Sequence, residues 1–151
     1  MPLSPLPLLR SGTLTEFRFN EPLSAPTGTP ANLFSYTLAT TYVLLDDSED
    51  RVWVNATARW YVTFSALGSA NVTFTIYRNG VAVFSAVQSV FNPIAGAATV
   101  SNVVHLQYVD VPLSGTAVTA LTPVTYSFAA TTEAVGPIFT SGPVTLSVAE
   151  I

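Results

Sequence analysis

Apolar and polar residues alternate along residues 51–65, whose sequence is RVWVNATARWYVTFS. The even positions are all apolar, whereas the odd positions include arginine, asparagine, threonine and serine. Because successive side chains of a β-strand point to opposite faces, this period of two predicts a long strand with one face against a core. The residues predicted to face that core are Val52, Val54, Ala56, Ala58, Trp60, Val62 and Phe64.

The same period predicts strands along most of the remaining chain. A short strand-like run lies at 14–19, and longer runs lie at 34–46, 71–78, 81–87, 99–111, 123–131 and 143–149. Turn-forming residues separate these runs at fairly regular intervals, and no helical pattern of useful length is present. Seven or eight strands arranged in this way predict an all-β antiparallel jelly-roll sandwich.

The dipeptide Asn79-Gly80 predicts a β-hairpin between two of these runs, because a type I′ turn needs positive φ at both central positions. A two-residue turn would pair Ile76 with Val83 and Phe74 with Ser85. One face of the hairpin would then consist of Val72, Phe74, Ile76, Val81, Val83 and Val87.

Residues 1–33 differ from the strand-rich remainder because they contain six prolines and many small polar residues. Proline favours extended backbone and donates no amide hydrogen, so we expect an extended Pro/Leu-rich arm over 1–33 and the jelly-roll domain over 34–151. The arm is richer in leucine than a solvated linker, which suggests that it docks on a neighbouring copy. A terminus that packs loosely on its own domain is the alternative. The residues expected to make the inter-subunit contact are Leu3, Leu6, Leu8, Leu9 and Phe17.

Composition strengthens the expectation of self-association. The chain of 151 residues suits a single domain, and only 9% of its residues are charged, against about 25% in an average soluble domain. A sandwich of this composition would leave apolar surface exposed as a monomer, so we expect an oligomer. Trp53, Tyr61, Tyr77 and Phe84 lie on outward faces by the alternation argument. With Tyr108 they are the predicted subunit interface, and stacking on sugar rings is the alternative use of such aromatics.

Charge and residue content exclude several classes of protein and of chemistry. Five scattered arginines without lysine, at a net charge of −4, do not form the basic footprint that nucleic acid requires. The absence of cysteine removes disulfides and thiolate chemistry. No apolar run is long enough to span a membrane, and prolines interrupt the N-terminal leucines, so we expect no cleaved signal peptide.

Candidate chemistry is sparse. Asp46, Asp47, Glu49 and Asp50 form an acidic turn that is a weak candidate for calcium, although its spacing matches no EF-hand loop. His105 is the single histidine and has Asp110 nearby in sequence, but no nucleophile motif accompanies it. We therefore expect a protein that is not an enzyme and that uses no cofactor.

The strand phrases VWVNATARWYVTF, VTFTIYRNGVAVFS, VHLQYVDVPLSG, TYSFAATT and GPVTLSVAEI occur in an order that resembles a known family. The family is the tumour-necrosis-factor-like jelly-roll domains of Bacillus and Paenibacillus endospore surface proteins, which include exosporium glycoproteins and fibrous appendage subunits. The resemblance covers residues 34–151 and implies a homotrimer packed through one aromatic-rich sheet face. Because a short apolar arm stands where the exosporium proteins have Gly-X-Y repeats, appendage subunits that stack through an N-terminal connector are the closer resemblance.

From this resemblance we expect a structural protein that assembles as trimers into a fibre or layer on the endospore surface. Its partners would be copies of itself and other spore-surface proteins. A glycan-binding or adhesive surface module and a viral capsid or fibre jelly roll are the alternatives.

Overall fold

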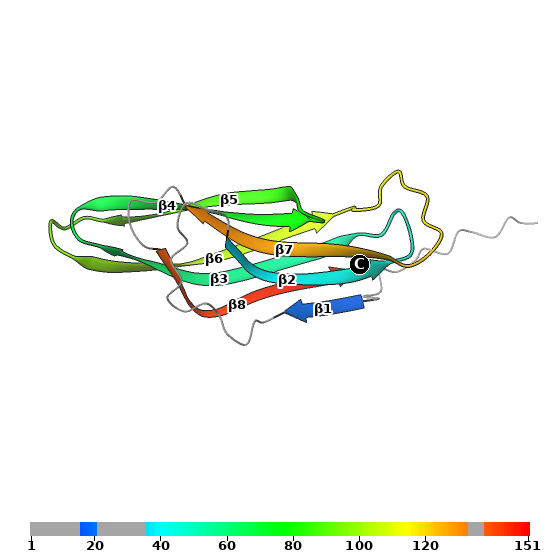
Figure 1. Ribbon diagram of the computed structural model, residues 1–151, viewed down its shortest axis with the longest axis horizontal. Helices are drawn as coiled ribbons and strands as arrows, with labels where there is room; N and C mark the ends of the chain where they lie inside the picture. Colours follow the sequence, from blue (N-terminus) through cyan, green and yellow to red (C-terminus); the bar gives the residue numbers. More distant parts are fainter. Residues whose placement is uncertain (1–15, 21–35, 133–137) are drawn as a thin grey trace, which may run out of the picture.

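The computed structural model describes residues 16–20, 36–132 and 138–151, and every regular element in these ranges is a β-strand (Figure 1). The strands are β1 (Glu16–Asn20), β2 (Tyr36–Leu45), β3 (Val52–Phe64), β4 (Gly68–Arg78), β5 (Val81–Asn92), β6 (Ala98–Asp110), β7 (Thr122–Thr132) and β8 (Ile138–Glu150). They form two antiparallel four-stranded sheets that pack against each other. The predicted all-β sandwich is confirmed.

The strand order is β1-β8-β3-β6 in the first sheet and β2-β7-β4-β5 in the second. The pairs β1·β8, β2·β7, β3·β6 and β4·β5 are therefore nested, with the first strand beside the last and the two middle strands side by side. This nesting brings together segments that are far apart in sequence. The core depends on long-range contacts throughout.

The core follows the alternation read from the sequence. The predicted inward residues of β3 are all buried, and so are the inward residues of β7 and β8. Three aromatic rings connect the sheets at the centre, because Phe74 lies 5.9 Å from Trp60 and 5.8 Å from Phe128 between ring centroids. Aromatic pairs at this separation add stability beyond the area they bury.

The hairpin register differs from the prediction by one residue. Arg78 pairs with Val81 and Tyr77 with Ala82, so the turn does have two residues, with φ of 48° at Asn79 and 81° at Gly80. Beyond that point a bulge pairs Ile76 with Phe84 instead of Val83.

The bulge moves the inward positions of β5 from odd to even residues. Phe84 and Ala86 pack against the core, whereas Val81 and Val87 are 63% and 62% exposed. The prediction that Val87 shares a face with Phe74 and Ile76 is therefore wrong, and so is the prediction that Phe84 faces outward. Val81 lies on the turn side of the bulge, where it pairs with Arg78.

β1 belongs to the sandwich although it lies inside the segment predicted as an arm. Its five residues pair with β8 from Glu16↔Glu150 to Asn20↔Leu146. Glu16 also reaches the second sheet, where its Oε2 accepts a 2.7 Å hydrogen bond from the amide of Leu44 on β2. The Arg18 guanidinium lies 5.0 Å from the centroid of the Tyr42 ring. β1 thus connects the two sheets along one side.

The other side of the sandwich has a polar connection of the same kind. Asn102 on β6 donates a 3.1 Å hydrogen bond to Gln88 on β5, so the two edge strands are linked across the sheets. Among the described residues, no helix is long and apolar enough to cross a membrane.

Candidate functional site

A row of apolar side chains crosses all four strands on the outer face of the β1-β8-β3-β6 sheet. Phe17 pairs with Ala149, Ala149 with Trp53, and Trp53 with Val109, so these residues lie at one level. Trp53 and Val109 occupy positions that alternate with the buried residues of their strands and therefore point away from the core. The pairing places Phe17 and Ala149 at the same level of the sheet, and Ala149, between Phe17 and Trp53, is only 2% exposed. Phe17 and Val109 are exposed, and Trp53 is half-buried. Exposed apolar residues that are contiguous in this way are typical of an interaction surface.

Two further residues extend this row toward the end of the molecule where the chain terminates (Figure 1). Val111 follows β6, and Ile151 follows β8, where its amide donates a 2.9 Å hydrogen bond to the carbonyl of Arg51. Both side chains are exposed. We call the set Phe17, Trp53, Val109, Val111 and Ile151 the apolar row.

Polar residues border the apolar row on its other side. One level along the strands, Asn55 pairs with Ser147 on β8 and with Gln107 on β6. His105 lies on the same face, and its Nε2 is 2.8 Å from Asn55 Oδ1. An apolar centre with a polar border is the usual anatomy of a protein interface.

The five aromatic residues predicted as a subunit interface do not form one surface. Trp53 belongs to the apolar row, and Tyr61 lies farther along the same face, stacked on Phe139 at 5.1 Å between ring centroids. Tyr77 alternates with the buried residues of β4 and so lies on the outer face of the second sheet. Phe84 and Tyr108 stack on each other at 5.5 Å and pack against the core. Of the five, only Trp53 and Tyr61 therefore share an outer face, and the part of these residues in a subunit interface stays a prediction.

Phe17 is the one predicted arm residue that the structure describes, and it is 54% exposed at the edge of the apolar row. Leu3, Leu6, Leu8 and Leu9 lie outside the described residues. Their contact with a neighbouring subunit stays a prediction.

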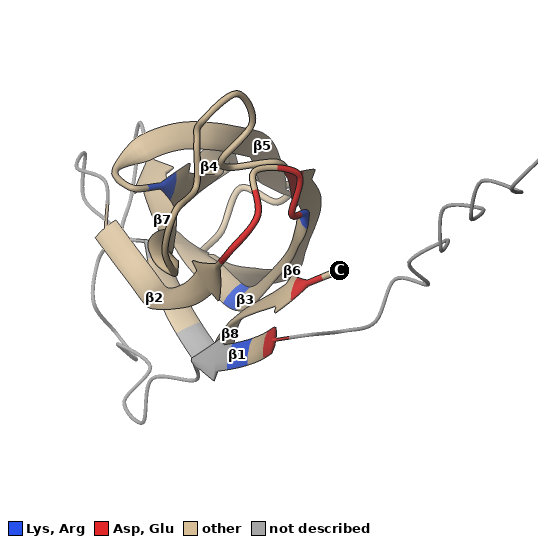
Figure 2. Ribbon diagram, turned by 90° about the vertical axis from the view of Figure 1, so that its right-hand side faces the viewer, with Lys and Arg blue, Asp and Glu red and all other residues tan. Residues whose placement is uncertain are grey.

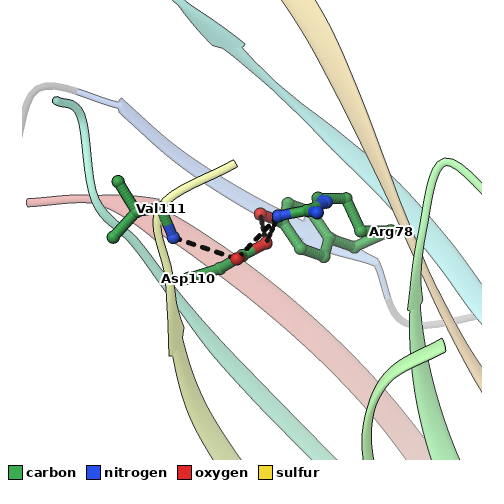
Figure 3. A network of polar contacts seen from close by, with 4 residues as sticks. Arg78, Asp110 and Val111 are labelled. Carbon is green, nitrogen blue, oxygen red and sulfur yellow. Dashed lines mark hydrogen bonds and ion pairs between the residues drawn. The ribbon is translucent and has the colours of Figure 1, made fainter. Parts of the chain in front are cut away.

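A buried polar network connects the two sheets beneath this end of the sandwich (Figure 3). Asp110, which is 4% exposed, accepts hydrogen bonds from Arg78 Nη1 on both carboxylate oxygens, at 2.9 and 3.1 Å. The Tyr126 hydroxyl donates to Asp110 Oδ2 at 2.9 Å, and the Val111 amide donates to Oδ1 at 2.9 Å. The carboxylate is fully engaged, so its charge is compensated inside the fold.

The pKa of Tyr126 in this network is strongly shifted. Burial raises the pKa of the Tyr126 phenol well above its ordinary value, and the negative charge of Asp110 raises it further. The phenol therefore remains a hydrogen-bond donor under all ordinary conditions. Its role is structural, because it bonds the second sheet to a carboxylate of the first.

The acidic turn mainly organises its own backbone. Asp50 Oδ2 accepts hydrogen bonds from the amides of Asp46 and Asp47, at 3.2 and 2.8 Å, and Asp47 Oδ1 accepts one from the amide of Glu49. The structure brings ligand atoms of Asp46, Asp50 and Glu150 within 4.8 Å of one another, whereas Asp47 and Glu49 stand outside this group. The weak calcium prediction stays untested, and the hydrogen bonds account for the side chains of Asp47 and Asp50 as turn formers.

His105 and Asp110 are close in sequence but lie on opposite faces of β6. His105 is exposed on the outer face, whereas Asp110 points into the core toward Arg78 and Tyr126. General acid-base catalysis by this pair would require the two side chains to converge on one substrate. Because they lie on opposite faces of β6, the two side chains do not converge on one substrate.

An open hollow of about 580 Å³ lies between the acidic turn and the loop after β6. Its lining consists of Ser48, Glu49, Arg51, Val111, Ser114 and Gly115. The hollow adjoins the apolar row through Val111. It is polar and open, unlike the enclosed apolar pockets that hold most small ligands.

Comparison of the chain with protein-family models finds no match, and comparison with curated proteins finds none.

Proposed function

We propose that this chain is a structural protein that assembles with copies of itself through the outer face of its β1-β8-β3-β6 sheet. The apolar row is the observation that carries the proposal, because it places five apolar side chains together on the surface of a chain with few charges. The outer face of the other sheet also exposes apolar side chains, among them Tyr42 and Val87, but hydroxyl groups lie between them. There, hydroxyl groups bond to each other, as in the pairs Thr40–Ser127 and Thr75–Ser85.

The energetics favour an interface that is larger than the row. Complete burial of a side chain of this size stabilises by about 1.5–3 kcal/mol, and the exposed members of the row still have roughly half of their surface in water. The row would thus contribute on the order of 5 kcal/mol, which only matches the lower estimates of the cost of association, about 4–15 kcal/mol. The neighbouring polar residues must therefore join the interface, with the row as its anchor.

The proposal extends to a jelly-roll homotrimer that stacks into a fibre or layer on an endospore. The nested strand pairs support the jelly-roll assignment, since folding one long hairpin onto itself produces this order. The trimer, the fibre and the endospore location rest on the resemblance of the strand phrases to tumour-necrosis-factor-like spore-surface domains. Its partners on the endospore would be other proteins of the spore surface.

The test replaces Val109 with glutamate and measures the oligomeric state by sedimentation velocity. Val109 is 50% exposed on edge strand β6, within the proposed interface. Because a carboxylate there would lose its hydration on association, we expect the dissociation constant to rise at least about a hundredfold, or about 2.8 kcal/mol.

Val87→Glu is the matched control, since Val87 is 62% exposed on the edge strand of the other sheet. It should associate as the wild type does. A wild-type protein that is monomeric at millimolar concentration, or a Val109→Glu variant that associates as tightly as the control, would overturn the proposal.

A further inference from the structure

The two ends of the sandwich differ in charge. All the aspartates and glutamates among the described residues lie at the end where the chain terminates, onto which Figure 2 looks. They are Glu16, Asp46, Asp47, Glu49, Asp50, Asp110 and Glu150. At the opposite end the described connections are the β3–β4 turn and the β5–β6 loop, and the described segments 64–68 and 91–99 contain no charged residue.

These two segments expose three large apolar side chains. Leu67 is 61% exposed, Phe91 57% and Ile94 53%. Phe91 pairs with Ser69, so it lies beside the turn that contains Leu67, and Ile94 belongs to the loop that follows. We call Leu67, Phe91 and Ile94 the apolar tip.

A single buried side chain holds the two loops of the apolar tip together. Asn92 is 1% exposed. Its amide nitrogen donates to the carbonyls of Ala66 and Gly96 at 2.9 and 3.0 Å, and its Oδ1 accepts a 3.2 Å bond from the amide of Ile94. The tip is therefore organised before any partner arrives, which lowers the entropic cost of binding.

We propose that the apolar tip binds the leucine-rich segment 1–15 of a second copy, so that copies join head to tail. The inference rests on the proposed function and names the surface that receives the arm. The ligand chemistry is an extended segment with Leu3, Leu6, Leu8 and Leu9 as apolar anchors.

The point at which the segment joins the fold supports a contact between copies. Glu16 pairs with Glu150, so residues 1–15 enter β1 at the acidic end, opposite the apolar tip. β3 has 13 residues, which corresponds to a sandwich length of ~40 Å. The leucines precede Glu16 by 7–13 residues, and an extended chain of that length reaches at most about 25–45 Å.

This reach decides between the molecule's own tip and that of a neighbour. Only the most distant leucine could approach the tip of its own molecule, and only if the whole segment ran back along the sandwich. A second copy placed beyond the acidic end presents its tip to all of them. The leucines of one copy can therefore all reach the tip of the next copy, whereas most of them cannot reach the tip of their own molecule.

Charge favours the same polarity. Two acidic ends brought together would repel each other, whereas an acidic end beside segments 64–68 and 91–99 meets no charged residue of those segments. The charges of the described residues therefore favour head-to-tail contact. Because each copy carries one arm and one tip, the contact is heterologous and propagates.

The test uses disulfide formation between two variants, which the absence of cysteine in the chain makes unambiguous. Leu6→Cys protein is mixed with Leu67→Cys protein under mild oxidation, and cross-linked pairs are counted on a non-reducing gel. Because the two sites would meet at each junction, we expect at least tenfold more cross-linked pairs than in the control mixture of Leu6→Cys with Val87→Cys. Val87 is as exposed as Leu67 but lies on the outer sheet face.

A third mixture, Leu6→Cys with Val109→Cys, asks whether the segment prefers the apolar row. Stronger cross-linking to Val109→Cys than to Leu67→Cys, or equal cross-linking in all three mixtures, would overturn the assignment of the tip. Sedimentation of the same samples separates this failure from the failure of the proposed function. Oligomers without the tip cross-link leave the proposed function standing, whereas the absence of any association removes it as well.

Discussion

Asp110 is the residue that most directly couples the two sheets. Its partners Arg78 and Tyr126 come from β4 and β7, both in the sheet opposite its own strand β6. A buried carboxylate without partners would destabilise the fold by about 3–5 kcal/mol. Here, four hydrogen bonds satisfy it, so the network contributes orientation at the acidic end as well as stability.

Alkaline pH should weaken this network through Tyr126. Its pKa is raised in the folded protein from an ordinary value of 10.0, so the unfolded chain releases the proton first and holds fewer protons above that pH. The stabilisation is complete below pH 10 and is lost as pH rises, by up to about 1.4 kcal/mol per pH unit. Tyr126→Phe should remove this part of the fall in the free energy of unfolding, measured by urea denaturation between pH 9 and about 11.

Tyr77→Phe is the control for this experiment, because Tyr77 lies outside the network and is half-exposed. The variant should keep the wild-type pH dependence. Identical slopes for Tyr126→Phe and wild type would show that the phenol is not coupled to folding.

The sequence itself contains a signal for this buried network. Arg78, Asp110 and Tyr126 all occupy even positions on strands whose even positions face inward. A polar residue at an inward position signals a buried partner. Which residues are partners could not be read from the sequence, because that depends on which strands face each other across the sandwich.

The β4–β5 hairpin shows the limits of prediction at the scale of elements. The turn was predictable because Asn-Gly has a local conformational cause. The bulge was not, since Val81, Ala82, Val83 and Phe84 are all apolar and no polar residue marks which side faces out. A shift of one residue then reversed the faces of Phe84 and Val87.

Gly80→Ala should destabilise the hairpin by about 1 kcal/mol, since its φ of 81° is unfavourable for a residue with a Cβ atom. An added Cβ would meet no atom within 4 Å, so the cost is conformational and not steric. Thermal unfolding measures it, with a lower melting temperature expected.

Gly96→Ala is the matched control because its Cβ would also meet nothing within 4 Å and its φ is not positive. It should leave the melting temperature unchanged or raise it slightly. A Gly80→Ala variant as stable as this control would contradict the backbone argument.

For the whole molecule, the existence and approximate bounds of the strands could be predicted, whereas the apolar row could not. Alternation is local, and it identified every buried residue of β3 and most of those of β7 and β8. The row joins Phe17, Trp53 and Val109 through pairing between strands that are distant in sequence. Register of that kind is set by the nested arrangement of all eight strands.

Deletion of residues 2–12 should separate assembly through the sheet face from assembly along the axis. The variant keeps β1, the apolar row and the tip, so we expect folded oligomers that form no filaments under the electron microscope. Filaments of wild-type length would defeat the role of the arm.

A mixing experiment serves as the control for this deletion. The deletion variant has a tip but no arm, and a Leu67→Ser/Ile94→Ser variant has an arm but an altered tip. Each variant alone should form only the oligomer that assembles through the sheet face. The mixture should form one additional complex of finite size, in which the arms of one variant bind the tips of the other.

The way in which β1 joins the fold has a mechanical consequence for such an assembly. A pull on the segment before Glu16, directed along the strand, acts parallel to β1, whereas its hydrogen bonds to β8 run across it. Tension is then shared by the whole ladder in shear, and no single bond has to yield first. The additional attachment of Glu16 to Leu44 spreads the load to the opposite sheet, which suits a tether that must withstand stretching.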